Sequence, residues 1–229
     1  MKNIKHIFFD LDDTLWDFEK NSIYILQQLF LEFDLKHKLK TDFENFAGIY
    51  KTVNLQLWQQ YSKKEITKDY LRNRRFNLVF NQFNYDNYDE NIIITEHYLN
   101  RAPKGKHLKE GCIETLNYLK QNYHLHIITN GFKEIQGIKI ESCGLKDYFK
   151  NIIISEEHQL SKPEEKIFRL AEDFAFAKKE ECVMIGDNFE SDVEGALNAG
   201  WKAIYFAPEN SIINKGSHIK NLSELKLLF

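Results

Sequence analysis

The hydrophobic pattern of the chain begins with a short apolar run near its amino-terminal end. Residues 4–9, Ile-Lys-His-Ile-Phe-Phe, are rich in Ile and Phe, which predicts a buried strand. The run ends on three carboxylates, Asp10, Asp12 and Asp13, which are followed by Thr14. Because three like charges within four residues repel one another, we expect a cationic group beside them.

The pattern then changes to a helical one over residues 17–101, where Gly48 is the only glycine or proline. Apolar positions spaced 3.6 residues apart predict roughly four helices in this block. Thr41, followed three residues later by a glutamate, has the spacing of a capping box, and Thr67 is expected to open a further helix. Residues 92–94 fit either the last helix or a strand.

From about residue 108, strand and helix patterns alternate, which predicts a parallel, doubly wound sheet that includes the first strand. Pro163 is expected in the first turn of its helix, and Gly200 at the end of another. The predicted strands are 124–129, 151–155, 181–186 and 202–206, and the predicted helices are 112–122, 136–142, 164–176, 191–199 and 223–228.

The fold class is therefore α/β, with an all-helical domain inserted directly after the first strand. A length of 229 residues fits one core domain carrying a sizeable insertion. We predict a Rossmann-like core formed by residues 1–15 and 103–229, and a helical domain formed by residues 16–102.

Composition excludes several classes of function. With 43% hydrophobic residues, 28% charged residues and a net charge of −3, no global field favours nucleic acid polymers or an anionic membrane. No signal peptide or transmembrane run is visible. Cys112, Cys143 and Cys182 lack zinc or redox spacing, so reduced thiols in a cytoplasmic protein are expected. We expect a monomer or a weak homodimer.

Polar side chains of specific kinds follow the predicted strands. The carboxyl ends of parallel strands meet at one edge of a sheet, which is where open α/β sheets bind ligands. In chain order these side chains are Asp10 and Asp12, then Thr129, Asn130 and Gly131, then Lys162, and finally Asp187 and Asp192.

Each of these features also has a purely structural explanation. Asp10 and Asp12 fit a solvated acidic turn, and residues 129–131 fit an ordinary strand-to-helix turn. Lys162 fits a surface lysine before a helix, and Asp192 fits an acidic helix cap. Their common order and their common place in the fold favour a single site over four separate coincidences.

Together, the four stretches resemble the signatures of the haloacid dehalogenase superfamily of aspartate-nucleophile hydrolases. The resemblance covers the whole chain, and the helical insertion after the first signature is similar to the first cap type of that superfamily. The signatures here are Asp10-Leu11-Asp12-Asp13-Thr14, Thr129-Asn130-Gly131, Lys162-Pro163, and Gly186-Asp187 through Asp192.

The resemblance implies that Asp10 attacks a phosphate monoester and forms an aspartyl-phosphate. It implies a Mg²⁺ ion held by the Asp10 carboxylate, the Asp12 backbone carbonyl and Asp187. Asp192 and Thr14 are then expected to orient these ligands.

Phosphoryl oxygens would be bound by Thr129, Asn130 and Gly131, and Lys162 would neutralise charge on Asp10 and on the transferring group. Asp12 would protonate the leaving oxygen and later deprotonate the attacking water. Dehalogenases of the superfamily attack carbon and lack this second aspartate, so the resemblance favours phosphoryl transfer over dehalogenation.

The same signatures also resemble one branch within the superfamily. The stretches Asp-Leu-Asp-Asp-Thr-Leu-Trp-Asp-Phe, Ile-Thr-Asn-Gly-Phe and Ile-Gly-Asp-Asn-Phe-Glu-Ser-Asp are most similar to a nucleotidase branch that acts on pyrimidine and noncanonical nucleoside 5'-monophosphates. Substrate contacts are predicted in the helical insertion, although aromatic residues on helices are more often core and arginines more often solvated. The candidates are Trp16, Trp58, Tyr61, Arg72 and Arg75.

Three alternatives remain open. A phosphatase of sugar phosphates or other small metabolites would use the same catalytic residues. A phosphomutase similar to the β-phosphoglucomutases also carries the second aspartate, and it would protect its phospho-enzyme from water. A phospho-accepting signalling or binding module would show no multiple turnover.

Overall fold

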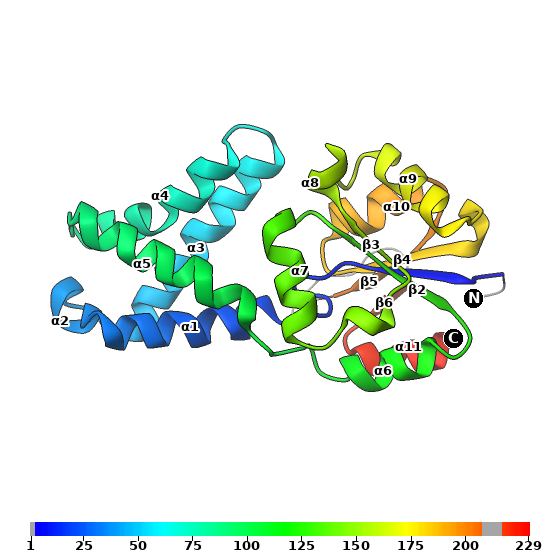
Figure 1. The fold of residues 1–229 in the computed structure, drawn as a ribbon, viewed down its shortest axis with the longest axis horizontal. Helices are drawn as coiled ribbons and strands as arrows, with labels where there is room; N and C mark the ends of the chain where they lie inside the picture. The colour runs from blue at the N-terminus through cyan, green and yellow to red at the C-terminus, as the bar shows by residue number, and fades with distance from the viewer. Residues whose placement is uncertain (1–2, 208–216) are drawn as a thin grey trace. The chain divides into compact units, whose positions relative to one another are not determined.

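The computed structural model describes residues 3–207 and 217–229 of the chain. The chain forms two compact units, drawn in Figure 1. The sheet unit comprises Met1–Glu19 and Gly105–Phe229, and the helical unit comprises Lys20–Lys104. Each unit is described by itself.

The sheet unit is built on six parallel strands in the order β3-β2-β1-β4-β5-β6. This is the strand order of a doubly wound sheet, so the predicted fold class is confirmed. The sequence pattern did not predict the sixth strand, which is three residues long. The strands are β1 (His6–Phe9), β2 (His124–Thr129), β3 (Asn151–Ile154), β4 (Cys182–Gly186), β5 (Lys202–Phe206) and β6 (Ser217–Ile219).

Helices cover both faces of this sheet (Figure 1). Leu116, Ile140 and Leu225 pack with one face, and Ile167 and Phe168 pack with the other. The helices of the sheet unit are α6 (Cys112–Leu119), α7 (Lys133–Ser142), α8 (Ser155–His158), α9 (Glu165–Ala175), α10 (Gly195–Asn198) and α11 (Leu225–Leu228), with 3₁₀ turns at Lys146–Tyr148, Lys179–Glu181 and Leu222–Glu224 and a π-helical turn at Phe189–Glu194; a further 3₁₀ turn, Ala102–Lys104, ends the helical unit.

Two helix predictions in this unit were wrong in detail. Pro163 does not lie in the first turn of α9, because the helix begins at Glu165 with Glu164 as its cap. The predicted helix 191–199 is instead a π-helical turn followed by the short α10. The turn begins before the predicted start at residue 191, because the Asn188 side chain caps it by accepting a hydrogen bond from the Ser191 N–H.

The helical unit contains the helices α1 (Phe18–Glu32), α2 (Leu35–Leu39), α3 (Phe43–Ser62), α4 (Lys68–Asn81) and α5 (Tyr88–Arg101), the first of which begins in the sheet unit. Its interior is strongly aromatic because four helices contribute rings to it. The buried aromatic side chains are Phe30, Phe46, Tyr50, Phe76, Phe80 and Tyr98.

Helix starts in this unit follow capping chemistry. Thr67 caps α4 as predicted, accepting a hydrogen bond from the Tyr70 N–H at 3.1 Å. The cap of α3 is Asp42 and not Thr41, because a carboxylate next to the helix competes better for the free Asn45 N–H. Residues 92–94 belong to α5, so the strand alternative is excluded.

The described cysteines are all free thiols. Among the helices that the structure describes, none has the length and apolar character needed to cross a membrane.

Candidate active site

The candidate site lies at the carboxyl edge of the sheet, where the strand order reverses between β1 and β4. Asp10 directly follows β1, and Asp187 directly follows β4. The two strand ends are fixed to each other, since the Asp10 N–H donates to the Ile185 carbonyl at 2.9 Å. This switch point is the usual ligand site of open α/β sheets.

A tight turn carries the chain away from β1 and shapes the acidic segment. The N–H groups of Leu15 and Trp16 both donate to the Leu11 carbonyl, at 3.0 and 2.8 Å, and Asp13 adopts φ +58°. The turn brings Thr14 to the end of β4. Its hydroxyl donates to Asp187 Oδ1 at 3.1 Å and accepts from the Asp187 N–H at 3.0 Å. Thr14 therefore orients Asp187.

Each of the three clustered carboxylates has its own lysine, which answers the predicted need for a cation. Three different parts of the sheet unit supply these lysines. The pairs are Asp10 with Lys162, Asp12 with Lys139, and Asp13 with Lys109, at N–O distances of 2.6, 2.5 and 2.9 Å.

Lys162 is the most enclosed of the three, with 1% of its side chain exposed. Its ammonium group contacts Asp10 Oδ1 and Asp192 Oδ1, both at 2.6 Å. Its backbone is held by Asn130, whose side-chain NH₂ donates to the Lys162 carbonyl at 2.9 Å while its oxygen accepts from the Lys162 N–H at 3.0 Å. The Asn130 side chain, which was predicted to bind phosphate, is thus engaged with the lysine backbone.

The electrostatics of the site are dominated by burial. Burial raises the pKa of Asp10 well above its ordinary range; Lys162 opposes this, and Asp192 and Asp187 add to it. Burial alone would lower the pKa of Lys162, but the charges of Asp10 and Asp192 outweigh it and raise that pKa. Burial, followed by the charges of Asp192 and Asp13, raises the pKa of Asp187 to about 7. The carboxylates therefore need more positive charge than Lys162 supplies.

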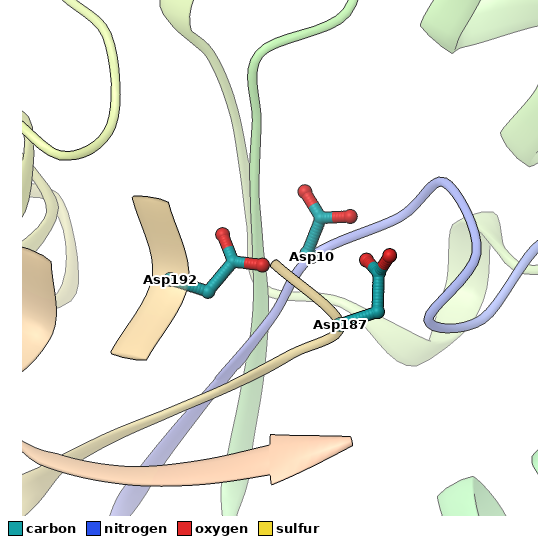
Figure 2. A group of neighbouring side chains, drawn as sticks. All are labelled: Asp10, Asp187 and Asp192. Carbon is teal, nitrogen blue, oxygen red and sulfur yellow. The ribbon is translucent and has the colours of Figure 1, made fainter. Parts of the chain in front are cut away.

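The donor set fits a divalent cation. Oxygen atoms of Asp10, Asp187 and Asp192 all lie within 4.8 Å of one another, and Figure 2 shows these carboxyl groups side by side. When all three carboxyl groups are ionised, the one Lys162 ammonium leaves two negative charges uncompensated. Hard carboxylate oxygens are the ligands that Mg²⁺ prefers.

Asp192 differs from the other two carboxylates because both of its oxygens already have protein donors. Oδ1 contacts Lys162 and accepts from the Ser191 hydroxyl at 3.1 Å, and Oδ2 accepts from the Asn188 N–H at 3.1 Å. Its approach depends on Gly186, since a Cβ there would lie 2.1 Å from Asp192 Oδ2. Asp192 is thus placed to support Lys162 and the loop after β4.

Thr129, at the end of β2, presents a hydroxyl whose oxygen already accepts two hydrogen bonds. The Gly131 N–H donates to it at 3.1 Å and the Gln136 side chain at 2.6 Å. With two acceptor positions used, the hydroxyl hydrogen is left to donate. A phosphoryl oxygen is a suitable acceptor for it.

Sequence reasoning missed Gln136 and Lys139, both of which contact Asp12. Gln136 Nε2 donates to Asp12 Oδ2 at 2.8 Å, and Lys139 Nζ donates to Asp12 Oδ1 at 2.5 Å. The available signal was their spacing, because residues three apart on a helix share a face. That helix, α7, begins directly after the polar end of β2.

Trp16 belongs to the sheet unit and is buried. Its indole N–H donates to the Gly105 carbonyl at 2.9 Å, and its ring lies 4.5 Å from Lys139 Nζ. Trp16, which was predicted as a substrate contact, thus packs against Lys139, the lysine that contacts Asp12.

The other predicted specificity residues lie in the helical unit. Trp58 and Tyr61 on α3 contact each other edge to face, with ring centres 5.7 Å apart, and Arg72 on α4 is half-buried. Arg75 is buried, and its guanidinium donates to the Tyr50 hydroxyl at 3.2 Å. The structure does not assign these four residues to the site in the sheet unit.

Fold and site together define an α/β protein with a buried carboxylate–lysine pair at the switch point of a doubly wound sheet. The chain belongs to the haloacid dehalogenase-like hydrolases, whose family model matches residues 4–200. The resemblance inferred from the four signatures is therefore confirmed.

Relatives of known name support the same family. The chain is 35% identical over 195 residues to the pyrimidine 5'-nucleotidase YjjG of Escherichia coli, which covers 85% of this chain and 82% of the relative. It is 32% identical over 208 residues to the pyrimidine 5'-nucleotidase PynA of Streptococcus pneumoniae, which covers 90% and 85%.

A solved structure matches the entire fold. The putative HAD-hydrolase YfnB of Bacillus subtilis, bound to magnesium, superposes with a TM-score of 0.87 at 27% identity and covers 99% of both chains.

Proposed function

We propose that the protein hydrolyses phosphate monoesters through a phospho-enzyme formed on Asp10. The observation that carries the proposal is the buried contact between Asp10 and Lys162 at the end of β1, beside Asp187. A carboxylate held by a buried ammonium, at the switch point of this family's fold, supports a role of Asp10 in nucleophilic catalysis. Asp12 supplies the second carboxylate that favours phosphoryl transfer over attack on carbon.

The reaction proceeds in two displacements at phosphorus. In the first, an Asp10 oxygen forms a bond to phosphorus while the bond from phosphorus to the ester oxygen breaks, and Asp12 gives its proton to that leaving oxygen. In the second, Asp12 takes a proton from water, the water oxygen bonds to phosphorus, and the bond from Asp10 to phosphorus breaks. Inorganic phosphate and the free Asp10 carboxylate result.

Other residues stabilise the transferring group. Lys162 neutralises charge on Asp10 and on the phosphoryl oxygens, and the Thr129 hydroxyl donates its free hydrogen to one of them. The Gly131 N–H donates to the Thr129 hydroxyl oxygen and so helps to orient that hydroxyl. Asn130 contributes by fixing the backbone of Lys162.

Magnesium is the proposed cofactor. The Asp10 carboxylate, the Asp12 backbone carbonyl and the Asp187 carboxylate would hold it, with Asp192 and Thr14 orienting its surroundings. When bound, Mg²⁺ supplies positive charge that polarises the phosphoryl group. The uncompensated negative charge at these residues supports the assignment, as does the magnesium bound in the YfnB structure.

We propose that the substrate is a nucleoside 5'-monophosphate, with a preference for pyrimidines. Two relatives that are more than 30% identical over most of the chain carry that activity in their names, and this supports the proposal. The helical insertion, predicted from the sequence as residues 16–102, would select the leaving group. Its candidate contacts remain Trp58, Tyr61, Arg72 and Arg75.

The residues of the sheet unit contact the phosphoryl group and the leaving oxygen, so they do not by themselves distinguish a nucleoside from a sugar. The test is therefore phosphate release from a panel of nucleoside monophosphates and sugar phosphates, with Mg²⁺ and with chelator, for wild type and Asp10→Asn. Metal-dependent turnover that is fastest on pyrimidine monophosphates and lost in Asp10→Asn is expected.

Two other outcomes would change the proposal. Turnover confined to sugar phosphates would replace the nucleotidase with a metabolite phosphatase, and a phospho-enzyme that persists in water would favour a mutase. Undiminished turnover in Asp10→Asn, or no turnover on any ester, would overturn the assignment of the nucleophile.

A further inference from the structure

Asp12 is held from one side by a single helix. Gln136 and Lys139, three residues apart on α7, each donate to a different oxygen of its carboxylate, at 2.8 and 2.5 Å. One donor on each oxygen fixes both the position and the plane of the carboxyl group. A proton-transferring group gains from such fixation because the transfer requires alignment with the leaving oxygen.

Substrate can reach Asp12 far more readily than it can reach Lys139. The Asp12 side chain is 30% exposed, whereas the Lys139 side chain is 9% exposed. The Lys139 ammonium lies between the Asp12 carboxylate and the Trp16 ring, whose centre is 4.5 Å away. Lys139 is thus less accessible to substrate than Asp12 is, and it acts on the reaction through the Asp12 carboxylate.

Gln136 bridges Asp12 and Thr129. Its Nε2 donates both to the Asp12 carboxylate and to the Thr129 hydroxyl oxygen. A single amide group therefore sets the distance between the proton-transferring carboxylate and the proposed phosphate-binding hydroxyl. Gln136 is fully buried, and the absence of a side chain at Gly131 makes room for it, since a Cβ there would lie 2.1 Å from its Nε2.

We propose that Lys139 and Gln136 are positioning residues for the proton transfers of Asp12. This inference rests on the proposed function, because it assumes that Asp12 protonates the leaving oxygen. It predicts a specific signature: loss of either residue slows reactions whose leaving group needs a proton, and spares those whose leaving group departs as an anion. A residue that only stabilised the fold would slow both alike.

The test compares single-turnover release of two leaving groups by excess enzyme with saturating Mg²⁺. One substrate is uridine 5'-monophosphate, or the alkyl phosphate that the panel shows to be hydrolysed fastest, and the other is p-nitrophenyl phosphate. In Lys139→Met we expect nucleoside release to slow by about tenfold to hundredfold and p-nitrophenol release by less than about threefold. Gln136→Met should show the same split with a smaller amplitude.

Two controls separate this inference from the proposed function. Asp12→Asn should show the same split in greater degree, and Asp10→Asn should release neither leaving group. Lys146→Met removes a lysine whose side chain is 66% exposed and which pairs with Glu141, and it should leave both rates unchanged. Circular dichroism melting of each variant identifies any that do not fold.

If Asp12→Asn shows the split while Lys139→Met and Gln136→Met slow both substrates equally, or slow neither, the positioning role is wrong and the proposed function stands. If Asp10→Asn retains activity, or Asp12→Asn shows no split, the proposed function itself fails. Should Lys139→Met not fold, the split in Gln136→Met decides the outcome.

Discussion

The two units of the molecule treat buried charge in opposite ways. In the sheet unit, the buried Lys162 contacts the carboxylates of Asp10 and Asp192. In the helical unit, Arg75 is 5% exposed, and its guanidinium carbon lies 6.0 and 5.7 Å from the ring centres of Tyr50 and Tyr98.

The difference is between ionic pairing and aromatic packing. Within the described part of the chain, Arg75 Nε has no hydrogen-bond partner. A different atom of the guanidinium, Nη1, donates to the neutral hydroxyl of Tyr50. A guanidinium stacks on aromatic rings and is weakly hydrated, so an aromatic interior can accommodate it. An ammonium needs formal counter-charges, and Lys162 has two. Buried charge is thus balanced by carboxylates in the sheet unit and accommodated by aromatic rings in the helical unit.

The largest effect is expected from removing the buried positive charge of Lys162. Lys162→Met should lower kcat/KM by about 10²–10³-fold, because the transferring group and Asp10 lose their buried positive charge. Steady-state phosphate release measures the effect. Lys5→Met, which removes an exposed lysine paired with Glu181, is the matched control and should stay near wild type. Equal activity in the two variants would contradict the role of Lys162.

Backbone space at the site gives a second and somewhat smaller effect. Gly186→Ala should lower activity by about tenfold to hundredfold, because its new Cβ would displace Asp192, which contacts Lys162. The measurement is kcat/KM at saturating Mg²⁺. Gly137→Ala on α7 is the control, since a Cβ there meets nothing within 4 Å. A Gly186→Ala enzyme as active as the control would show that Asp192 need not occupy its observed position.

A third prediction concerns stability and pH in the sheet unit. The Asn151 side-chain NH₂ lies 3.1 Å from His126 Nδ1, so that nitrogen accepts, and His126 Nε2 in turn lies 3.1 Å from His6 Nδ1. Burial, followed by the charges of His6, His124 and Lys150, lowers the pKa of His126 to about 3. The folded protein therefore binds a proton at His126 less readily than the unfolded chain does.

Acid is therefore expected to destabilise the folded protein at His126. Protonation favours the unfolded chain, so stability is greatest above the unfolded pKa near 6.5 and falls as the pH drops toward 3. Between pH 7 and pH 5 the loss from His126 alone is about 2 kcal/mol. Urea unfolding at both pH values measures it, with His126→Gln as the comparison. A loss of equal size in the variant would show that His126 is not its source.

The smallest expected effect lies in the helical unit. Gly48 is on the exposed side of α3, and a Cβ there meets nothing within 4 Å. Gly48→Ala should therefore stabilise the protein by about 0.5–1 kcal/mol, through helix propensity alone. Thermal unfolding measures the change. A destabilised variant would show that this stretch of α3 is constrained by something other than its own helix.

The sequence was sufficient to predict that Asp10, Lys162 and Asp187 lie close together, because each comes after a strand of one parallel sheet. The sequence did not reveal that Lys139 belongs to the site. A lysine on a helix is indistinguishable from a solvated lysine in sequence, and its contact with the Trp16 ring is seen only in the structure. Features that follow from the spacing of apolar residues and from the ends of strands could be predicted from the sequence. Side-chain contacts between residues far apart in the chain, such as that of Lys139 with Trp16, could not.

The same limit applies to smaller elements. Asn130 resembles a phosphate ligand in sequence, and its engagement with Lys162 is a contact across 32 residues. Strand β6 is too short for a period to be visible, and the π-helical turn arises from the cap at Asn188 rather than from any apolar repeat. Trp16 follows the acidic segment directly, yet its burial depends on distant packing.

The central claim is that Asp10 becomes phosphorylated during turnover. The most direct test is to quench the enzyme with acid during turnover of its best substrate, reduce the mixture with borohydride, and sequence the amino-terminal peptide by mass spectrometry. The account predicts conversion of Asp10 to homoserine, with Asp12 and Asp13 unchanged and no conversion in a sample without substrate. Conversion at another residue, or none during demonstrable turnover, would contradict it.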